Sequence, residues 1–216
     1  AFTSERTPLS ASSRVLSWHS DAARERDFEG HYRAQFDLEG DTLGIGLGGY
    51  AAGFWWNWPL TAQAHELHIS ALEALAFALN FFVLGALFEE LVGPKTALLT
   101  HCDALASVFG VAFGRSKSPL LVFIFESLEK VPAFARVKKY TATTHVAGPG
   151  NLLADAASRG LVHVLQDFAA QIGVTPIKRK LPQSALEFIN RAVAYARSLT
   201  PVEQSLAVGQ PNTPDS

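Results

Sequence analysis

Short apolar runs near the start of the chain predict strands. Residues 14–23 (RVLSWHSDAA) predict a short strand that ends near an acid, and residues 42–60 are rich in glycine, aromatic and aliphatic residues up to Pro59. A turn in the glycine-rich middle of this second stretch, or near Ala51–Gly53, would divide it into two adjacent strands. The charged stretch 24–41 predicts a loop or an exposed hairpin.

The longest apolar run, residues 65–88, predicts a helix because it is rich in alanine and leucine and has no internal proline. Its apolar part is nearly long enough to cross a bilayer. However, Glu73 and Asn80 lie inside it, and an acid at the centre of a membrane costs several kcal/mol. We therefore interpret it as a buried helix of a domain that has no membrane partner.

Strand and helix patterns alternate in the second half of the chain. Strands are predicted at 96–103 and 136–146, and helices at 104–113, 119–130, 152–172 and 184–199, with Asn151 as an N-cap. Such alternation favours parallel pairing, whereas the three opening strands suit an antiparallel meander. The predicted fold class is α/β: a mixed five-stranded sheet, antiparallel in its first three strands and then parallel, with helices on both faces.

Composition indicates a globular protein of a reducing compartment. The chain has 216 residues, of which 48% are apolar and 18% charged, as is typical of a globular protein. We expect a linker over 1–13, a domain over 14–175, and a C-terminal helix with a disordered tail over 176–216. The single cysteine, Cys102, excludes a disulfide framework and fits a reducing, intracellular compartment.

The net charge of −2 indicates no general attraction to polyanions. Contacts with nucleic acid would therefore come from local basic clusters such as 136-RVKK-139 and 178-KRK-180. Arg136, Lys138 and Lys139 either touch phosphates or form a solvated strand edge. Trp55, Trp56 and Trp58 either stack on bases or belong to the core. The run 44-GIGLGG-49 resembles a dinucleotide fingerprint, but a strand pattern follows it where a helix is needed.

Four acids carry the candidate chemistry. Asp21 ends the first strand, Asp103 ends the fourth, and Asp155 opens the helix after the fifth; strand carboxyl ends are where open α/β sheets bind ligands. Glu73 is predicted on the buried face of the long helix. Four converging carboxylates need divalent cations between them, and oxygen ligands select Mg²⁺ or Mn²⁺. Two such ions would clamp a phosphodiester during hydrolysis. Taken singly, each strand-end acid could instead be only a helix N-cap.

A family resemblance rests on four stretches of sequence. Residues 145-HVAGPGNLLADAASR-159 resemble the closing motif of the ribonuclease H domain of retroelement reverse transcriptases, roughly H-V-x-G-x-x-N-x-x-A-D-x-L-S-R. The matching residues are His145, Val146, Gly148, Asn151, Ala154, Asp155, Ser158 and Arg159. The stretches 19-HSDAA-23, 69-ISALEALA-76 and 100-THCDALASV-108 resemble, in order, the motifs that hold the family's other three catalytic acids.

The resemblance implies a ribonuclease H-like fold and a metal-dependent endonuclease that hydrolyses the RNA strand of RNA–DNA hybrids with two Mg²⁺ (or Mn²⁺) ions. The implied catalytic and metal-binding residues are Asp21, Glu73, Asp103 and Asp155. Asn151, Ser158, Arg159, Arg136 and Lys138 are candidates for contact with nucleic acid.

The motif is most similar to those of long-terminal-repeat or DIRS-like retrotransposons. This implies a reverse transcriptase polymerase domain as neighbour in a polyprotein, and a cytoplasmic or nuclear location. The absence of methionine fits a piece excised from a longer polypeptide. The main alternative is a catalytically inactive nucleic-acid-binding or spacer module of the same fold. A proofreading-type exonuclease is disfavoured because alanines follow Asp21, and an integrase core would carry a glutamate on its last helix.

Overall fold

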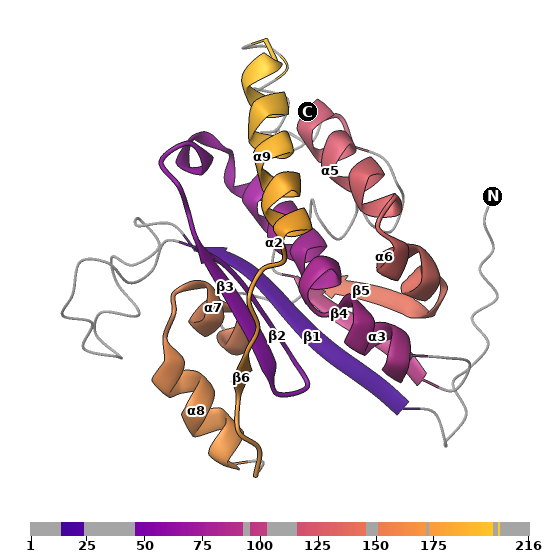
Figure 1. Ribbon diagram of the computed structural model, residues 1–216, viewed down its shortest axis with the longest axis vertical. Helices are drawn as coiled ribbons and strands as arrows, with labels where there is room; N and C mark the ends of the chain where they lie inside the picture. The colour runs from indigo at the N-terminus through magenta and orange to yellow at the C-terminus, as the bar shows by residue number, and fades with distance from the viewer. Residues whose placement is uncertain are drawn as a thin grey trace, which may run out of the picture.

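The computed structural model describes residues 14–23, 46–92, 96–102, 116–145, 151–171, 173–200 and 203, and it describes residues 14–23 by their backbone alone. The described strands are β1 (Arg14–Ala23), β2 (Gly46–Ala51), β3 (Phe54–Pro59), β4 (Thr96–Cys102), β5 (Thr141–His145) and β6 (Ile177–Lys178). Their spatial order is β5-β4-β1-β2-β3-β6 (Figure 1).

Strand directions follow the sequence pattern. β1 is antiparallel to β2 and β2 is antiparallel to β3, whereas β4 lies between β1 and β5 and is parallel to both. The α/β class is thus confirmed, but the prediction of one five-stranded sheet is wrong. The strands form a mixed group of three (β2, β3, β6) and a parallel group of two (β4, β5), and the backbone of β1 pairs with a strand of each. β6 has only two residues, too few for an apolar period to reveal.

Helices cover both faces of the strands. The alternate side chains of β3 point to opposite sides of the sheet and therefore enter two different cores. Trp56 packs with the larger core, together with side chains of α2 (Ile69–Val83), α5 (Pro119–Glu129), α6 (Pro132–Val137) and α9 (Gln183–Ser198). Its neighbour Trp55 packs with the smaller core beneath α7 (Leu152–Ser158) and α8 (Val162–Gln171). The sequence had left both tryptophans as either core or base-stacking residues, and the structure buries both.

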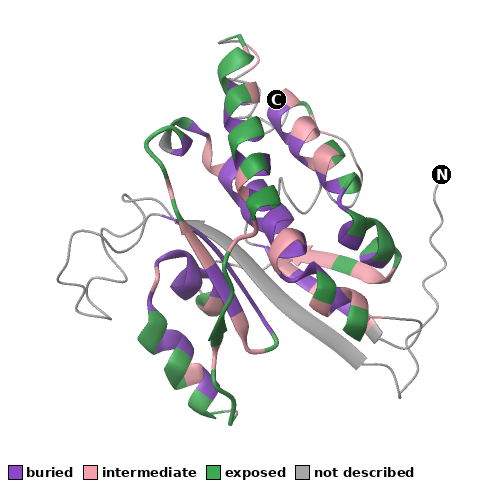
Figure 2. Cartoon of the chain, viewed as in Figure 1, coloured by how far each residue is buried: buried purple, intermediate pink, exposed green. Residues whose placement is uncertain are grey.

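The larger core is centred on α2, whose residues from Ala71 to Phe81 are all buried (Figure 2). The ring of Phe81 meets that of Phe134 of α6 edge-to-face, with centroids 4.7 Å apart, and Phe82 stacks on Phe188 of α9 at 5.0 Å. Such aromatic pairs stabilise beyond the area they bury. The C-terminal helix α9 is therefore part of this core.

The single helix predicted over 65–88 is divided. A 3₁₀ turn, η2 (Ala64–Glu66), precedes α2, and α3 (Gly85–Leu91) follows it after a bend of 66°. Gly85 lies so close to α6 that a Cβ there would come within 2.5 Å of the Ala133 Cβ. No single helix in the described part of the chain is long and apolar enough to cross a membrane, and only the bent pair α2–α3 reaches that composition.

Asn80 explains how a polar residue fits into so apolar a helix. It is fully buried, and its Oδ1 accepts a hydrogen bond from Trp56 Nε1 at 2.8 Å. Its amide nitrogen donates to the Ala76 carbonyl at 3.3 Å. A buried amide with both ends bonded avoids the cost of an unpaired polar group, and this bond ties α2 to β3.

Two other predicted elements are shorter than expected. The strand predicted over 136–146 is only β5, because Pro132 starts α6 and the 3₁₀ turn η3 (Lys138–Tyr140) follows it. The helix predicted over 152–172 breaks near Gly160, whose φ of +70° favours glycine, and α8 continues beyond it. The predicted linker 1–13, the stretch 24–41 and the helix 104–113 lie outside the described residues.

The glycines of β2 let two helices approach the sheet. A Cβ on Gly46 would lie 2.5 Å from the Ser158 carbonyl oxygen, and one on Gly48 would lie 2.5 Å from the Ser158 Cα. On the other face, a Cβ on Gly49 would lie 2.6 Å from Trp56 Nε1. The run that resembled a dinucleotide fingerprint is therefore a strand that packs closely against α7 on one side and against the Trp56–Asn80 bond on the other.

Substituting Gly48 by alanine is expected to lower the free energy of unfolding by about 3 kcal/mol, because the new Cβ would overlap a helix backbone that cannot rotate away. Gly173→Ala is the matched control: it has a φ of +70° and nothing within 4 Å of the added atom, so it should lose only about 1 kcal/mol. Urea unfolding of both variants tests this. Equal losses would show that α7 does not rest on Gly48.

Candidate carboxylate site

The parallel strands β1 and β4 end at the same edge of the sheet, where two of the predicted acids were expected. Asp21 lies near the carboxyl end of β1 and pairs in register with Gly48. Asp103 lies outside the described residues, but Cys102 directly before it pairs with Ser20, directly before Asp21. Because β1 and β4 run in the same direction, their carboxyl ends share this edge. The backbone thus supports the neighbourhood predicted for these two acids.

Glu73 enters from the face covered by α2. It lies in the second turn of the helix, and its side chain is only 4% exposed. α2 packs against β1 and β2, and the chain reaches it from the end of β3, a strand parallel to β1 (Figure 1). The prediction that Glu73 faces the protein interior is therefore confirmed. A carboxylate is rarely buried to this extent unless it is paired.

Asp155 approaches from the opposite face, in the first turn of α7. It is 5% exposed, and its Oδ1 accepts a 2.6 Å hydrogen bond from Nε of Arg159, one helical turn later. Arg159 is equally buried, so this is an ion pair in the interior. Such a pair is costly to break from one side, because the remaining charge stays buried.

The second oxygen of Asp155 is the notable atom of the site. Oδ2 is buried, and among the described residues it has no hydrogen-bond partner. A buried carboxylate oxygen without a donor is expensive, and a divalent cation is one group that offsets the cost. Oxygen donors suit Mg²⁺ or Mn²⁺. Asp155 therefore fits the role of a metal ligand through one oxygen, while Arg159 holds the other.

Two more residues of the closing motif support this turn. The Asn151 carbonyl accepts the Asp155 amide at 3.0 Å, and the Ser158 hydroxyl donates to the Asp155 carbonyl at 2.8 Å. Asn151 occupies the N-cap position as predicted, although its buried side chain makes no capping bond. Both side chains lie inside the protein, so their predicted contact with nucleic acid has no support in this conformation.

Arg159 was also a candidate for contact with nucleic acid, and its burial against Asp155 gives it a different role. It orients the carboxylate instead of presenting a charge to solvent. The spacing of four residues on a helix is the signal that could have revealed the pair from the sequence.

Arg136 and Lys138 lie at the other end of the sheet. Both precede β5, whereas Asp103 follows β4, and these two strands are parallel. Arg136 donates to Glu89 at 2.7 Å, and this contact raises the pKa of its guanidinium. Lys138 pairs with Glu129. The predicted strand edge is wrong for both, because Arg136 lies on α6 and Lys138 on η3.

No group of three or more His, Cys, Asp and Glu side chains converges among the residues that the structure describes. The described side chains include those of Glu73 and Asp155, but not those of Asp21 and Asp103. His101 on β4 lies two residues before Asp103, and burial lowers the pKa of its imidazole.

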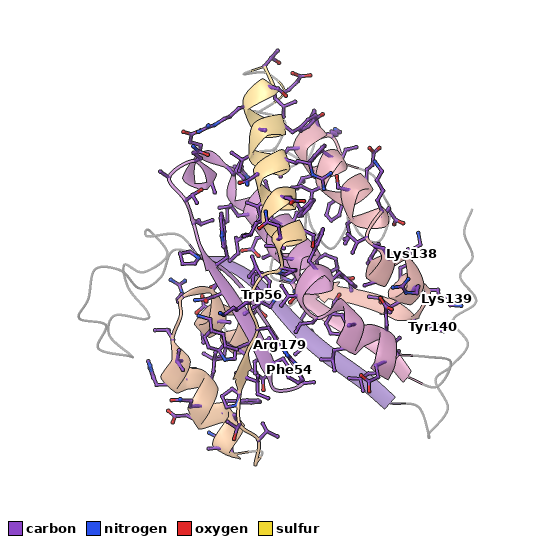
Figure 3. All side chains as sticks on the ribbon, viewed as in Figure 1. Phe54, Trp56, Lys138, Lys139, Tyr140 and Arg179 are labelled. Atoms are coloured by element: carbon purple, nitrogen blue, oxygen red, sulfur yellow. The ribbon has the colours of Figure 1, made fainter. Side chains whose placement is uncertain are left out.

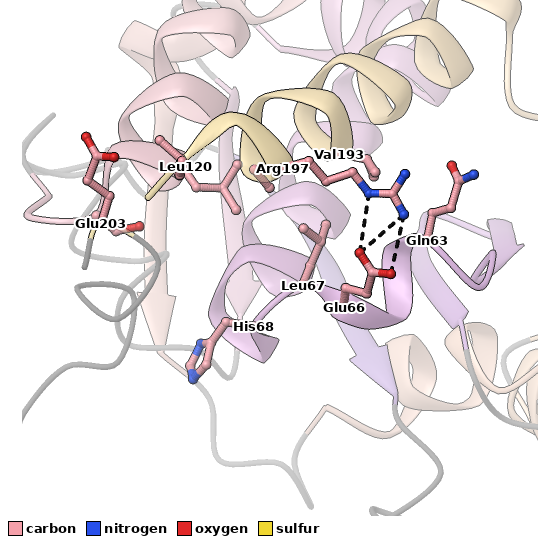
Figure 4. A pocket seen from close by; sticks show the side chains of 11 residues that line it. Gln63, Glu66, Leu67, His68, Leu120, Val193, Arg197 and Glu203 are labelled. Atoms are coloured by element: carbon pink, nitrogen blue, oxygen red, sulfur yellow. Dashed lines mark hydrogen bonds and ion pairs between the residues drawn. The ribbon is translucent and has the colours of Figure 1, made fainter. Parts of the chain in front are cut away.

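Two hollows lie on the face covered by α2, α5 and α9, and neither Glu73 nor Asp155 lines them. One, of about 160 Å³, lies between η2, the start of α5 and the end of α9 (Figure 4). On its rim Arg197 donates to both oxygens of Glu66, at 3.2 to 3.4 Å, and so ties the last turn of α9 to η2. The other, of about 510 Å³, has Phe81, Phe82 and Phe123 in its lining.

Comparisons of the chain with known protein families, with curated proteins and with solved structures found no match.

Removing the cation from the buried pair is expected to destabilise the fold. Arg159→Met should lower the free energy of unfolding by about 3 to 5 kcal/mol, since it leaves the Asp155 carboxylate buried and unpaired. The double variant Asp155→Leu/Arg159→Met should lose less than Arg159→Met alone. Urea unfolding in EDTA measures both.

The matched control is Arg197→Met, because the Arg197–Glu66 pair is 48% and 63% exposed and should contribute at most about 1 kcal/mol. If Arg159→Met cost no more than this control, the buried pair would not stabilise α7. Adding Mg²⁺ is expected to restore part of the stability of Arg159→Met, because a cation bound to the folded state alone shifts the equilibrium toward it.

Proposed function

We propose that this chain is a ribonuclease H-like, metal-dependent endonuclease that hydrolyses the RNA strand of RNA–DNA hybrids. The observation that carries the proposal is the buried Oδ2 of Asp155, which lacks a protein donor among the described residues. It belongs to a helix that rests on Gly46 and Gly48, and Gly48 pairs with Asp21.

The topology supports the ribonuclease H-like assignment. The order β5-β4-β1-β2-β3, with an antiparallel meander followed by parallel strands and with helices on both faces, agrees with the fold implied by the motif resemblance. Asp21 lies on β1, and Asp103 follows the adjacent parallel strand β4 in the sequence. Glu73 lies on the helix on one face, and Asp155 lies on the helix on the other. That combination suits a cluster of acids at one sheet edge.

In this proposal Asp21, Glu73, Asp103 and Asp155 would hold two Mg²⁺ or Mn²⁺ ions. When bound, such ions would supply an acidified water and would offset the charge of the phosphodiester. The task of the protein is positioning: Arg159 fixes the rotamer of Asp155 through Oδ1 and leaves Oδ2 for the ion. The Ser158 hydroxyl and the Asn151 carbonyl hold the first turn of α7 in place.

The biological setting rests on the motif resemblance alone. The proposal puts the domain beside a reverse transcriptase polymerase in a retrotransposon polyprotein, in the cytoplasm or nucleus, where it would degrade the RNA template during reverse transcription.

One observation favours the alternative, an inactive nucleic-acid-binding or spacer module. The ion pair with Arg159 partly neutralises Asp155 without any metal, so this acid could persist in a fold that has lost its activity. The two candidates differ in whether hybrid cleavage depends on the carboxylates.

The test is cleavage of an end-labelled RNA–DNA hybrid in Mg²⁺ and in Mn²⁺ by the wild type, Asp155→Asn and Asp103→Asn. The expected result is metal-dependent cutting of the RNA strand, reduced at least about 100-fold by either substitution, because each removes a ligand charge from the ions. Asp167→Asn is the matched control: Asp167 is an exposed acid on α8, so its loss should leave the rate unchanged.

Cutting that persists in Asp155→Asn and Asp103→Asn would contradict the carboxylate mechanism. An absence of cutting by the wild type, with no Mg²⁺ binding detectable by calorimetry, would favour the inactive module.

A further inference from the structure

The last described strand of the sheet, β6, and the two residues after it carry three cations, Lys178, Arg179 and Lys180, here called the basic strip. Lys178 ends β6, and the Arg179 amide extends the ladder with a 2.7 Å bond to the Trp55 carbonyl. All three residues are exposed. The nearest acids along the chain are Asp167 and Glu187, so residues 168–186 hold these cations and no acid.

The basic strip differs from four other cations of the molecule in lacking acidic partners. Arg136, Lys138, Arg159 and Arg197 each form an ion pair with a carboxylate. Lys178, Arg179 and Lys180 form no ion pair with any residue that the structure describes. An unneutralised row of positive charge is an attractive surface for a polyanion, even in a chain whose net charge is −2.

Aromatic rings hold two of the three cations at the edge. Lys178 Nζ lies 4.8 Å from the centroid of the Trp55 ring, and Arg179 Cζ lies 4.4 Å from that of Phe54. Phe54 and Trp55 project to opposite faces of β3, so one cation flanks each face of the edge strand. Figure 3 shows Arg179 beside Phe54, far from Lys138 and Lys139. Restrained cations lose less side-chain entropy when they bind a ligand.

The register relates the basic strip to the candidate carboxylate site. Asp21 pairs with Gly48, and Gly48 pairs with Asn57 of β3. Lys178 pairs with Trp55, two residues before Asn57 on the same strand. The strip therefore begins about 14 Å across the sheet from the backbone of Asp21, which is three strand spacings, and about 7 Å along the strands. A nucleic-acid duplex cleaved at the carboxylate edge is large enough to reach it.

From this arrangement we infer that Lys178, Arg179 and Lys180 bind the phosphate backbone of the RNA–DNA hybrid, to one side of the cleaved bond. The inference rests on the proposed nuclease function and adds to it a positioning surface. Phosphate contacts fix the orientation of a duplex without reading its sequence, so cleavage would be positioned without a base preference from this edge. A protective role for edge-strand lysines, which discourages edge-to-edge pairing of two copies, is the competing account.

The test is the salt dependence of hybrid binding, measured by fluorescence anisotropy with a labelled RNA–DNA hybrid in Mg²⁺. An Asp103→Asn background prevents cleavage during the measurement. The variant is Lys178→Gln/Arg179→Gln/Lys180→Gln. The matched control is Lys130→Gln/Arg191→Gln/Arg197→Gln. It removes the same charge from exposed positions at the end of α5 and on α9.

We expect the strip variant to bind at least about 10-fold more weakly at 0.1 M salt, and the slope of log K against log salt to fall in magnitude by about 2 to 3. The control should keep the slope of the parent. An unchanged slope in the strip variant would overturn the inference, as would a parent protein that binds no hybrid. A strip variant that binds like the parent but self-associates in sedimentation would assign the cations to edge protection and also overturn it.

The outcome is separable from that of the nuclease proposal. Weaker binding by the strip variant together with no cleavage by the wild type would support the role of the basic strip and contradict the nuclease proposal. Cleavage by the wild type with unchanged binding by the strip variant would contradict only the inference about the basic strip.

Discussion

The close approach of α7 to β2 is the constraint on which the candidate site depends. Gly46 and Gly48 leave no side chain between the strand and the backbone of Ser158, so the helix lies directly on the sheet. A larger residue in β2 would lift α7, and with it Asp155, away from the strand that pairs with Asp21. The position of the carboxylate is therefore set by the absence of side chains in a neighbouring strand, because close-packed elements cannot shift independently.

Buried polar groups distinguish the structural part of the molecule from the candidate site. Asn80 and Trp56 satisfy each other between α2 and β3, and they need nothing from outside the protein. Asp155 and Arg159 form a buried ion pair, yet Oδ2 of the carboxylate keeps no donor among the described residues. The open Oδ2 is the feature that makes this ion pair a candidate binding site.

The sequence predicted the α/β class and the directions of the paired strands, since strand and helix patterns alternate in the second half of the chain, but it did not predict how the strands are grouped in the sheet. It failed where tertiary contacts decide. The long helix is divided at Leu84, next to the close approach of Gly85 to Ala133, and α6 and η3 occupy the start of the stretch where alternation indicated a strand. Burial also changed the meaning of Arg159, because a motif shows that an arginine is present but not whether it faces solvent. β6 was not predicted, because two residues are too few to show an alternation of apolar and polar positions.

The central claim is that carboxylates from β1, α2, β4 and α7 meet around divalent cations. The most direct measurement is the anomalous diffraction of a crystal grown with Mn²⁺. The account predicts Mn²⁺ bonded to Oδ2 of Asp155 and to Glu73, at the carboxyl edge of β1 and β4. A crystal in which Asp155 Oδ2 accepts a hydrogen bond from a protein side chain, with no Mn²⁺ near either acid, would contradict it.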